Sequence, residues 1–241
     1  MKTPSAADIV RVWELGREKP GWYRGLLMLA PAFPDLYFKD LSVWPLGRRN
    51  IALFKLRAAL FSHSLTCVAA CPKCGRSSEF SAAVGDLCPH DLDPSSSLAE
   101  EHDLEVAGRA LRIRLLTSLD LANAREPSLS IEHPDLLRQA VLTTETEWED
   151  LPAGAHSTIA DRLYELDPQV ELQMGVVCSN CGHEWSSPFD IAGYLWTEIG
   201  GMAQRLMQDV HLMARAYGWR EADILAMSSA RRQFYVGKIG A

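Results

Sequence analysis

Two five-residue stretches decide the fold: CPKCG at residues 71–75 and CSNCG at residues 178–182. Each spaces two cysteines three positions apart and follows the second with glycine, and 103 residues lie between Cys74 and Cys178. In a zinc knuckle the backbone turns so that N–H groups point at the cysteine sulfurs, and glycine adopts the positive φ that this turn needs. The repeat therefore predicts two knuckles that share one metal ion. The four predicted ligands are Cys71, Cys74, Cys178 and Cys181.

Strand-like patterns flank both knuckles. Residues 68–70 lead into the first knuckle and residues 79–84 follow it. Before the second knuckle, apolar residues alternate with other residues from 172 to 176, and residues 183–189 follow this knuckle. The sequence therefore predicts two β-hairpins of one zinc ribbon, split by a long insertion. Closing a loop of about 100 residues costs roughly 4–5 kcal/mol, whereas a structural zinc contributes about 10–16 kcal/mol at neutral pH. One structural Zn²⁺ per chain can thus hold the insertion closed.

The cysteines also allow two alternatives to the zinc ribbon. A redox C-x-x-C needs only one motif, with its first cysteine at a helix N-terminus, and four free buried thiols are the remaining alternative. Four thiolates fill a tetrahedral zinc and leave no position for a catalytic water, so we expect a structural ion and no enzyme activity. Cys67 and Cys88 are interpreted as small core residues, although Cys67 could also serve as a backup ligand. His183 is interpreted as a residue of the knuckle turn.

Composition and charge narrow the class of protein. The 241 residues are 47% apolar and 23% charged, which is typical of a folded soluble protein. The net charge of −7 is opposite to that of most proteins that bind nucleic acid or anionic membranes. No apolar run approaches 18 residues, which predicts no membrane insertion, and residues 1–5 lack the apolar core of a signal peptide. We therefore expect a protein that is made in the cytoplasm, without a small-molecule substrate.

The predicted fold is α+β, mostly helical, with the split four-cysteine ribbon and a long C-terminal helix. It divides into a helical N-terminal cap at residues 1–65, the ribbon with its inserted hairpin and helices at 66–190, and a C-terminal helical docking segment at 191–241. Within the insertion, the acidic stretch 86–105 is interpreted as a solvated linker, because it contains seven acidic residues and no lysine or arginine.

The rest of the insertion has both strand and helix patterns. Residues 104–116 predict a hairpin that turns near Gly108. Thr117 is predicted to cap a helix, with Asp120 as the second residue of a capping box. The patterns also predict two short helices, at residues 135–142 and 158–166.

The C-terminal segment begins with a long helical pattern. Apolar residues recur in steps of three and four from residue 191 to residue 217, with Asp190 as the predicted N-cap and Gly218 as the glycine that follows the helix. This apolar face fits either a core helix or a surface that packs on another protein. Short helices at 221–227 and 230–239 follow, the second capped by Ser228, and a docking role is favoured over DNA reading by a helix-turn-helix. The predicted partner-binding residues are Leu206, Val210, Met213, Trp219, Arg231, Arg232, Phe234 and Tyr235.

Several of these stretches resemble a known family. The runs at 211–219, 224–227 and 231–235, with the strand and helix start at 111–120, resemble the T-even-like phage baseplate proteins, which take part in assembling the central hub of contractile tails. The knuckles and residues 190–196 are similar to relatives encoded beside phage tails and phage-derived contractile injection systems.

The resemblance implies a structural or assembly component of a baseplate, which binds other baseplate or hub proteins and can be retained in the particle. Two alternatives stay open. One is a zinc-ribbon regulator that binds nucleic acid, and the other is a transient tail-assembly chaperone.

Overall fold

The computed structural model describes residues 1–88, 101–106, 108–124, 130–144, 148, 151–152 and 154–239. Its contacts divide the chain into two compact units, Met1–Phe38 with Ala192–Ala241 and Lys39–Ile191. The chain leaves the second unit after Ile191, one residue beyond the predicted boundary, and the residues of the predicted 1–65 cap are divided between the two units. The model has the α+β fold that the sequence predicts.

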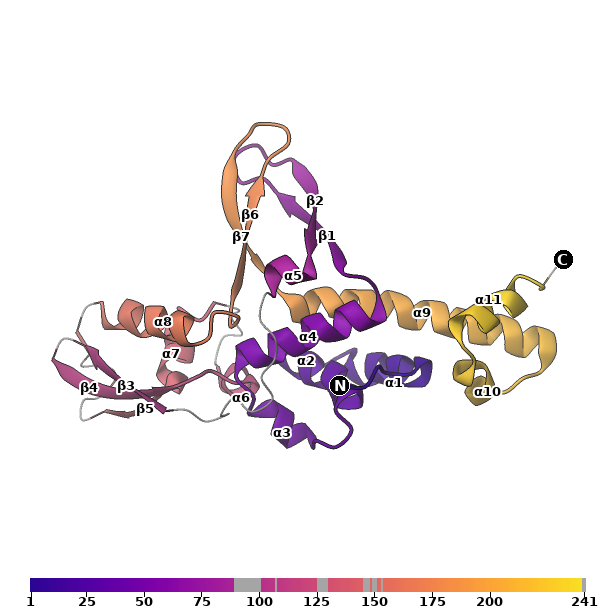
Figure 1. Cartoon of the computed structure of the whole chain (residues 1–241), viewed down its shortest axis with the longest axis horizontal. Coiled ribbons are helices and arrows are strands. Elements are labelled where there is room, and N and C mark those ends of the chain that lie inside the picture. The colour runs from indigo at the N-terminus through magenta and orange to yellow at the C-terminus, as the bar shows by residue number, and fades with distance from the viewer. Residues whose placement is uncertain are drawn as a thin grey trace. The chain divides into compact units, whose positions relative to one another are not determined.

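The first unit is helical. Ser5 and Asp8 form a reciprocal capping box at the start of its first helix, which packs against the second helix and against the first helix after Tyr217. Figure 1 shows the long C-terminal helix, which spans the predicted residues 191–217. The elements are α1 (Ala6–Gly16), α2 (Gly21–Leu29), the 3₁₀ turn η1 (Ala30–Ala32), α9 (Ile191–Tyr217), α10 (Glu221–Ala226) and α11 (Ser229–Val236), and α3 (Phe38–Ser42) crosses into the second unit.

The apolar face of α9 is mostly core. Its side chains Leu195, Ile199, Leu206 and Met213 are buried. The first unit also has close helix contacts, because a Cβ at Gly16 would overlap the indole of Trp196. After Tyr217 the chain turns at Gly218, whose φ is +67°, and this conformation confirms the glycine predicted beyond the helix.

The second unit holds the ribbon and the insertion. Helix α4 precedes the first ribbon hairpin, and the insertion lies between the two ribbon hairpins in the chain. Its elements are α4 (Leu46–Leu60), β1 (Ser64–Ala70), β2 (Ser77–Ala83), α5 (Val84–Leu87), β3 (Glu101–Val106), β4 (Arg109–Arg114), α6 (Ser118–Asn123), α7 (Pro134–Ala140), β5 (Val141–Thr144), α8 (Ala155–Leu166), β6 (Leu172–Val177) and β7 (Glu184–Phe189).

The insertion has its own apolar core. Strands β3, β4 and β5 form an antiparallel sheet in that order, and Leu111, Ile113, Leu136, Ile159 and Leu163 belong to one buried cluster. In Figure 1 the helices α7 and α8 lie beside this sheet. The hairpin prediction is confirmed, with its turn at the positive-φ Gly108.

Two sequence predictions in the insertion need correction. The stretch 86–105 is not linker throughout, because residues 84–87 are helical and residues 101–106 form β3; residues 89–100 lie outside the described part. In β3 the carboxylates of Glu101 and Asp103 face Arg112 across the strand pair, which explains why acidic residues fit there. The helix predicted to end at residue 142 ends at Ala140, because β-branched Val141 begins the edge strand β5.

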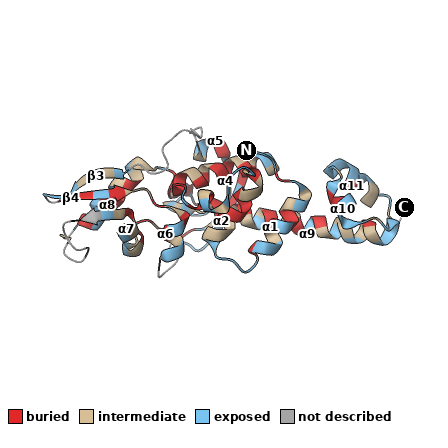
Figure 2. Cartoon of the chain, turned by 90° about the horizontal axis from the view of Figure 1, so that it is seen from below, coloured by how far each residue is buried: buried red, intermediate tan, exposed pale blue. Residues whose placement is uncertain are grey.

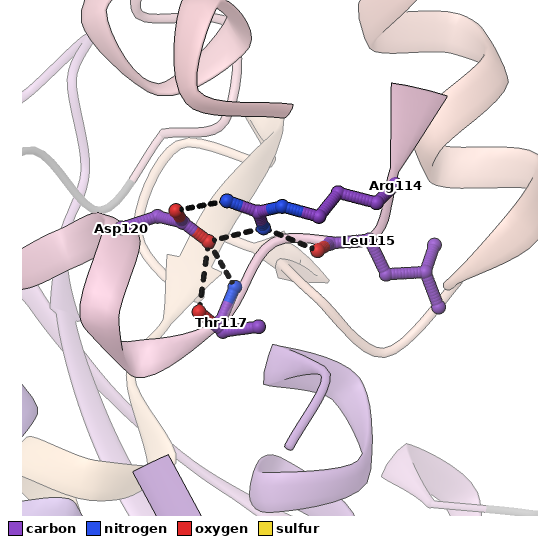
Figure 3. Close-up of polar contacts among 4 residues, drawn as sticks. All are labelled: Arg114, Leu115, Thr117 and Asp120. Carbon is purple, nitrogen blue, oxygen red and sulfur yellow. Dashed lines mark hydrogen bonds and ion pairs between the residues drawn. The ribbon is translucent and has the colours of Figure 1, made fainter. Parts of the chain in front are cut away.

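The predicted capping box at α6 is present and is extended by an arginine. Asp120 accepts hydrogen bonds from the backbone N–H and the hydroxyl of Thr117, at 2.7 and 2.8 Å (Figure 3). Arg114 at the end of β4 binds both oxygens of the same carboxylate, at 2.6 and 2.8 Å. This bidentate pair joins the strand to the helix that follows it.

Polar side chains of α4 form hydrogen bonds to the insertion and hold it against α4. The amide of Asn50 donates to the carbonyl oxygens of Gln169 and Val170, at 2.8 and 3.2 Å. The buried guanidinium of Arg49 donates to Asn50 Oδ1 and to Ser118 Oγ. Burial lowers the pKa of Arg49 to about 10, which leaves it a cation at neutral pH.

Candidate metal centre

The two C-x-x-C-G stretches form equivalent turns. In the first turn, the N–H of Cys71 donates to the carbonyl oxygen of Arg76 at 2.9 Å. The N–H of Gly75 donates to the carbonyl oxygen of Cys71 at 2.8 Å. In the second, Cys178 and Gly182 make the same pair of bonds, at 2.8 and 2.9 Å. The two glycines have φ values of +72° and +66°, so the positive-φ role predicted for them is confirmed.

Two hairpins bring these turns together. Strands β1 and β2 pair from Ser64 with Ala83 to Ala70 with Ser77, and β6 and β7 pair from Leu172 with Phe189 to Val177 with Glu184. Figure 1 shows the two hairpins side by side, with their turns at the same end. Alternate side chains such as Leu65, Met174 and Val176 are buried, as expected for hairpins that pack face to face.

The base of the ribbon is fixed to α4. The buried Arg57 donates to the carbonyl oxygens of Ser62 and Ser64, just before and at the start of β1. Phe54 of α4 stacks on Phe189 at the end of β7, with ring centroids 6.0 Å apart. One helix therefore orients both hairpins, although 88 residues lie between them in the sequence.

The four predicted ligand sulfurs form one cluster. All lie within 4.8 Å of one another, and the closest contacts cross between the knuckles: Cys71 to Cys181 at 3.7 Å and Cys74 to Cys178 at 3.6 Å. A tetrahedral zinc with Zn–S bonds of about 2.3 Å would place its sulfurs roughly 3.8 Å apart. The cluster therefore has the dimensions of a four-thiolate metal site, and it could hold a metal ion.

Each hairpin also contributes a hydrogen-bond donor to a sulfur of the other hairpin. The buried hydroxyl of Ser78, on β2, donates to the sulfur of Cys178 at 4.0 Å. The side-chain amide of Asn180, in the second knuckle, donates to the sulfur of Cys74 at 3.7 Å. Such outer donors orient and stabilise metal-bound thiolates. Neither residue was predicted from the sequence, because neither belongs to the cysteine pattern.

The local dipoles favour thiolate sulfur. Backbone N–H groups of Cys181 and Asn180 lower the pKa of Cys178 to about 6. The N–H of Arg76 likewise lowers the pKa of Cys74. The N–H of His183 lowers the pKa of Cys181, but burial and the neighbouring sulfurs outweigh it and raise that pKa to about 11. Thiolates this close repel one another, and a bound divalent cation removes that cost.

The remaining cysteines stand apart from the metal cluster. Cys67 is buried in β1, where it is paired with Phe80, and Cys88 follows α5. Neither belongs to the four-sulfur cluster found among the described residues, so the backup-ligand role of Cys67 has no support in this geometry. His183 accepts the Cys178 N–H through its backbone carbonyl, and its ring stacks near Trp185, which fits the predicted knuckle-turn residue.

A pocket of about 180 Å³ also lies in the second unit, within the described residues. Arg49, Asn50 and Glu171 are among its polar lining groups. The first two are hydrogen-bonded as described above, and the Glu171 carboxylate accepts from the N–H of Ile131 and the hydroxyl of Tyr164, both at 3.0 Å. These groups therefore act in packing the insertion.

The predicted partner-binding residues divide into buried and accessible ones. Leu206 and Met213 are buried, and Val210 is partly buried. Arg232 is only 5% exposed; it donates to the carbonyl of Met227 and lies 3.7 Å from the Asp209 carboxylate. Leu206, Met213 and Arg232 are therefore packed inside the chain and not available on its surface, which favours the core interpretation for this part of α9.

The accessible residues gather around the last two helices. Trp219 stacks on Tyr217 at 4.7 Å and meets Tyr235 edge-on at 4.8 Å, and Phe234 also contacts Tyr235. Phe234 is 59% exposed and Tyr217 36%. The guanidinium of Arg231 lies 5.8 Å from the ring centre of Tyr235, and Lys238 Nζ lies 5.6 Å from that of Phe234.

We call this group the aromatic–basic surface, and in Figure 2 α11 is coloured mainly as exposed and intermediate. Its residues are Tyr217, Trp219, Arg231, Phe234, Tyr235 and Lys238. Tyr217 and Lys238 were not among the predicted partner-binding residues. For Lys238, its position four residues after Phe234 is a usable sequence signal.

No family model matches the chain, and neither a curated protein nor a solved structure matches it. Within the described part, every helix falls short of the length or hydropathy that crossing a membrane requires. What the protein does is therefore inferred from the metal centre, the aromatic–basic surface and the quoted sequence resemblance.

Proposed function

We propose that this protein is a zinc-stabilised structural component of the central hub, or baseplate, of a contractile tail in a phage or a phage-derived injection system. It is made in the cytoplasm, binds neighbouring tail proteins through its C-terminal helices, and is retained in the assembled particle. The ion is Zn²⁺, one per chain, and its role is to hold the two ribbon hairpins together.

The observation that carries a structural role is the closed four-sulfur cluster. Four protein thiolates occupy all positions of a tetrahedral ion, so no position remains for a water or substrate. Two of the sulfurs come from residues 71–74 and two from residues 178–181, so binding the ion also fixes the ends of the whole insertion. Zinc is favoured because tetrahedral four-sulfur sites suit it, although iron can occupy the same geometry.

Two further observations support a role in assembly. The aromatic–basic surface exposes large apolar rings, which proteins rarely leave uncovered without an interaction to make. The stretches that resemble the baseplate family include residues 211–219 and 231–235, which supply five of the six residues of this surface. The resemblance and the surface therefore point to the same end of the chain.

The metal is tested on purified protein by elemental analysis and by Co²⁺ substitution. We expect about one zinc per chain and, with Co²⁺, the visible absorption of a tetrahedral tetrathiolate site. Iron in place of zinc, or no bound metal under reducing conditions, would contradict the zinc assignment.

The hub assignment is tested by co-expression with the tail proteins encoded in neighbouring genes and by mass spectrometry of purified particles. A hub subunit should co-purify with them and stay in mature particles at a fixed stoichiometry. Loss from mature particles would indicate a transient chaperone, and salt-dependent DNA binding without tail partners would indicate a nucleic-acid regulator. Point substitutions are preferable to deleting residues 219–241, because that deletion also removes Ile224 and Leu225, which are buried.

A further inference from the structure

The aromatic–basic surface has a charge that differs from that of the whole chain. The chain has a net charge of −7. From residue 209 to residue 239 it has the five cations Arg215, Arg220, Arg231, Arg232 and Lys238 against the three acids Asp209, Glu221 and Asp223, a local balance of +2. Arg232 is buried beside Asp209, whereas the other four cations are exposed.

The cations belong to the apolar surface itself. Arg231 and Tyr235 lie one helical turn apart on α11, and Lys238, just past the end of this helix, follows Phe234 by four residues. Each cation lies near an aromatic ring. An exposed aromatic residue beside an exposed cation is the composition of a binding hot spot, in which the ring supplies apolar contact and the cation selects the charge of the partner.

The arrangement of the rings separates two kinds of acidic partner. Single-stranded nucleic acid would need open ring faces on which bases can stack. Here Trp219 covers one face of Tyr217, and Arg231 and Lys238 lie over Tyr235 and Phe234. A protein segment needs no flat stacking platform, because aliphatic side chains can pack on ring edges while carboxylates reach the cations.

We propose that the aromatic–basic surface binds an acidic segment of a neighbouring protein, with an apolar side chain packed on Phe234 and Tyr217 and carboxylates paired with Arg231 and Lys238. This inference rests on the proposed function, because it names the chemistry of the partner that the C-terminal helices take. The rings supply most of the affinity, since exposed ion pairs contribute little on their own. The charges supply selectivity and make binding weaken as salt concentration rises.

The test is selection of binders from a random 16-residue peptide display library on the immobilised full-length protein. Peptides recovered should be enriched in Asp and Glu next to aliphatic or aromatic residues. The best peptide, made synthetically, should bind at least tenfold more weakly to Phe234→Ala and to the double variant Arg231→Glu with Lys238→Glu. A peptide with its acids replaced by lysine should prefer that double variant over the wild type.

A matched control carries the same charge change elsewhere in the first unit. The double variant Arg11→Glu with Lys19→Glu alters two exposed cations that are not part of the aromatic–basic surface and should bind the acidic peptide as the wild type does. Metal content and thermal midpoint of every variant show whether folding is preserved. Recovery of basic or uncharged peptides, recovery of none, equal loss in the control, or tighter binding of a dT20 oligonucleotide would each overturn the proposal.

These outcomes are distinguishable from failure of the hub assignment. If acidic peptides are selected but no tail protein co-purifies, the surface proposal stands and the hub assignment falls. If tail proteins still co-purify with Phe234→Ala and with the charge-reversed variant, the hub assignment stands and the surface proposal falls.

Discussion

The carboxylate of Asp167 accepts a hydrogen bond from the backbone N–H of Gly47 at 2.8 Å, across 120 residues of sequence. Asp167 caps the C-terminus of α8 in the insertion, and Gly47 lies in the first turn of α4, whose N–H groups have no partner within the helix. An acidic group at a helix N-terminus is also favoured by the helix dipole. The same helix that anchors the ribbon thus anchors the insertion.

Gly47→Ala is expected to destabilise the second unit by about 1–3 kcal/mol. A Cβ at this position would overlap the partly buried carboxylate of Asp167 and push it away from the Gly47 N–H. Urea unfolding followed by circular dichroism measures the change. The control is Gly85→Ala in α5, where a Cβ meets no atom within 4 Å and the free energy of unfolding should change by less than about 0.5 kcal/mol.

Asp167→Asn should change how stability depends on pH. Burial raises the pKa of Asp167 from 3.8 to about 6, although hydrogen bonds from Gly47 and Gln169 oppose this shift. The folded state therefore holds the proton of the Asp167 carboxyl more tightly than the unfolded state does. This proton stabilises the folded state fully below about pH 4, and its contribution is lost as the pH rises through 6. The two-unit shift corresponds to about 3 kcal/mol.

The measurement is the difference in free energy of unfolding between wild type and Asp167→Asn from pH 4 to pH 7.5. The wild type should lose up to about 3 kcal/mol relative to the variant over this range. Metal binding affects both proteins alike and cancels in the difference. A difference that is independent of pH would show that folding does not raise the pKa of Asp167.

Cys71→Ser and Cys178→Ser should each abolish zinc binding and lower the free energy of unfolding by several kcal/mol, because site formation and folding are coupled. Elemental analysis and thermal unfolding measure both effects. Cys88→Ser removes a sulfur outside the four-sulfur cluster and should keep one zinc per chain. If both ligand variants retain full zinc and stability, the shared site is refuted.

Asn50→Ala should cost about 3 kcal/mol of stability. It leaves the buried carbonyl oxygens of Gln169 and Val170 without this donor, and it removes the acceptor of two Arg49 N–H groups. Asn123→Ala, at an exposed position of α6, is the matched control. Chemical denaturation compares the two, and equal small effects would mean that water replaces the Asn50 contacts.

Local sequence patterns predicted most of the helices and the ribbon. The C-x-x-C-G repeat predicted both knuckle turns, and its glycines have the positive φ that the turn requires. The steps of three and four from residue 191 predicted α9, and Thr117 with Asp120 predicted the cap of α6. These features depend on residues within one or two turns of one another, so the sequence contains the whole signal.

Tertiary structure decided the features whose partners lie far apart in the chain. The donors Ser78 and Asn180 contact sulfurs of the opposite knuckle, and Asp167 contacts Gly47 across 120 residues. Arg232 looks like a surface cation in the sequence, but the packing of α11 places it beside Asp209 and buries it. Sequence periodicity marks which face of a helix is apolar, whereas only the fold determines whether that face is covered by the same chain or left for another protein.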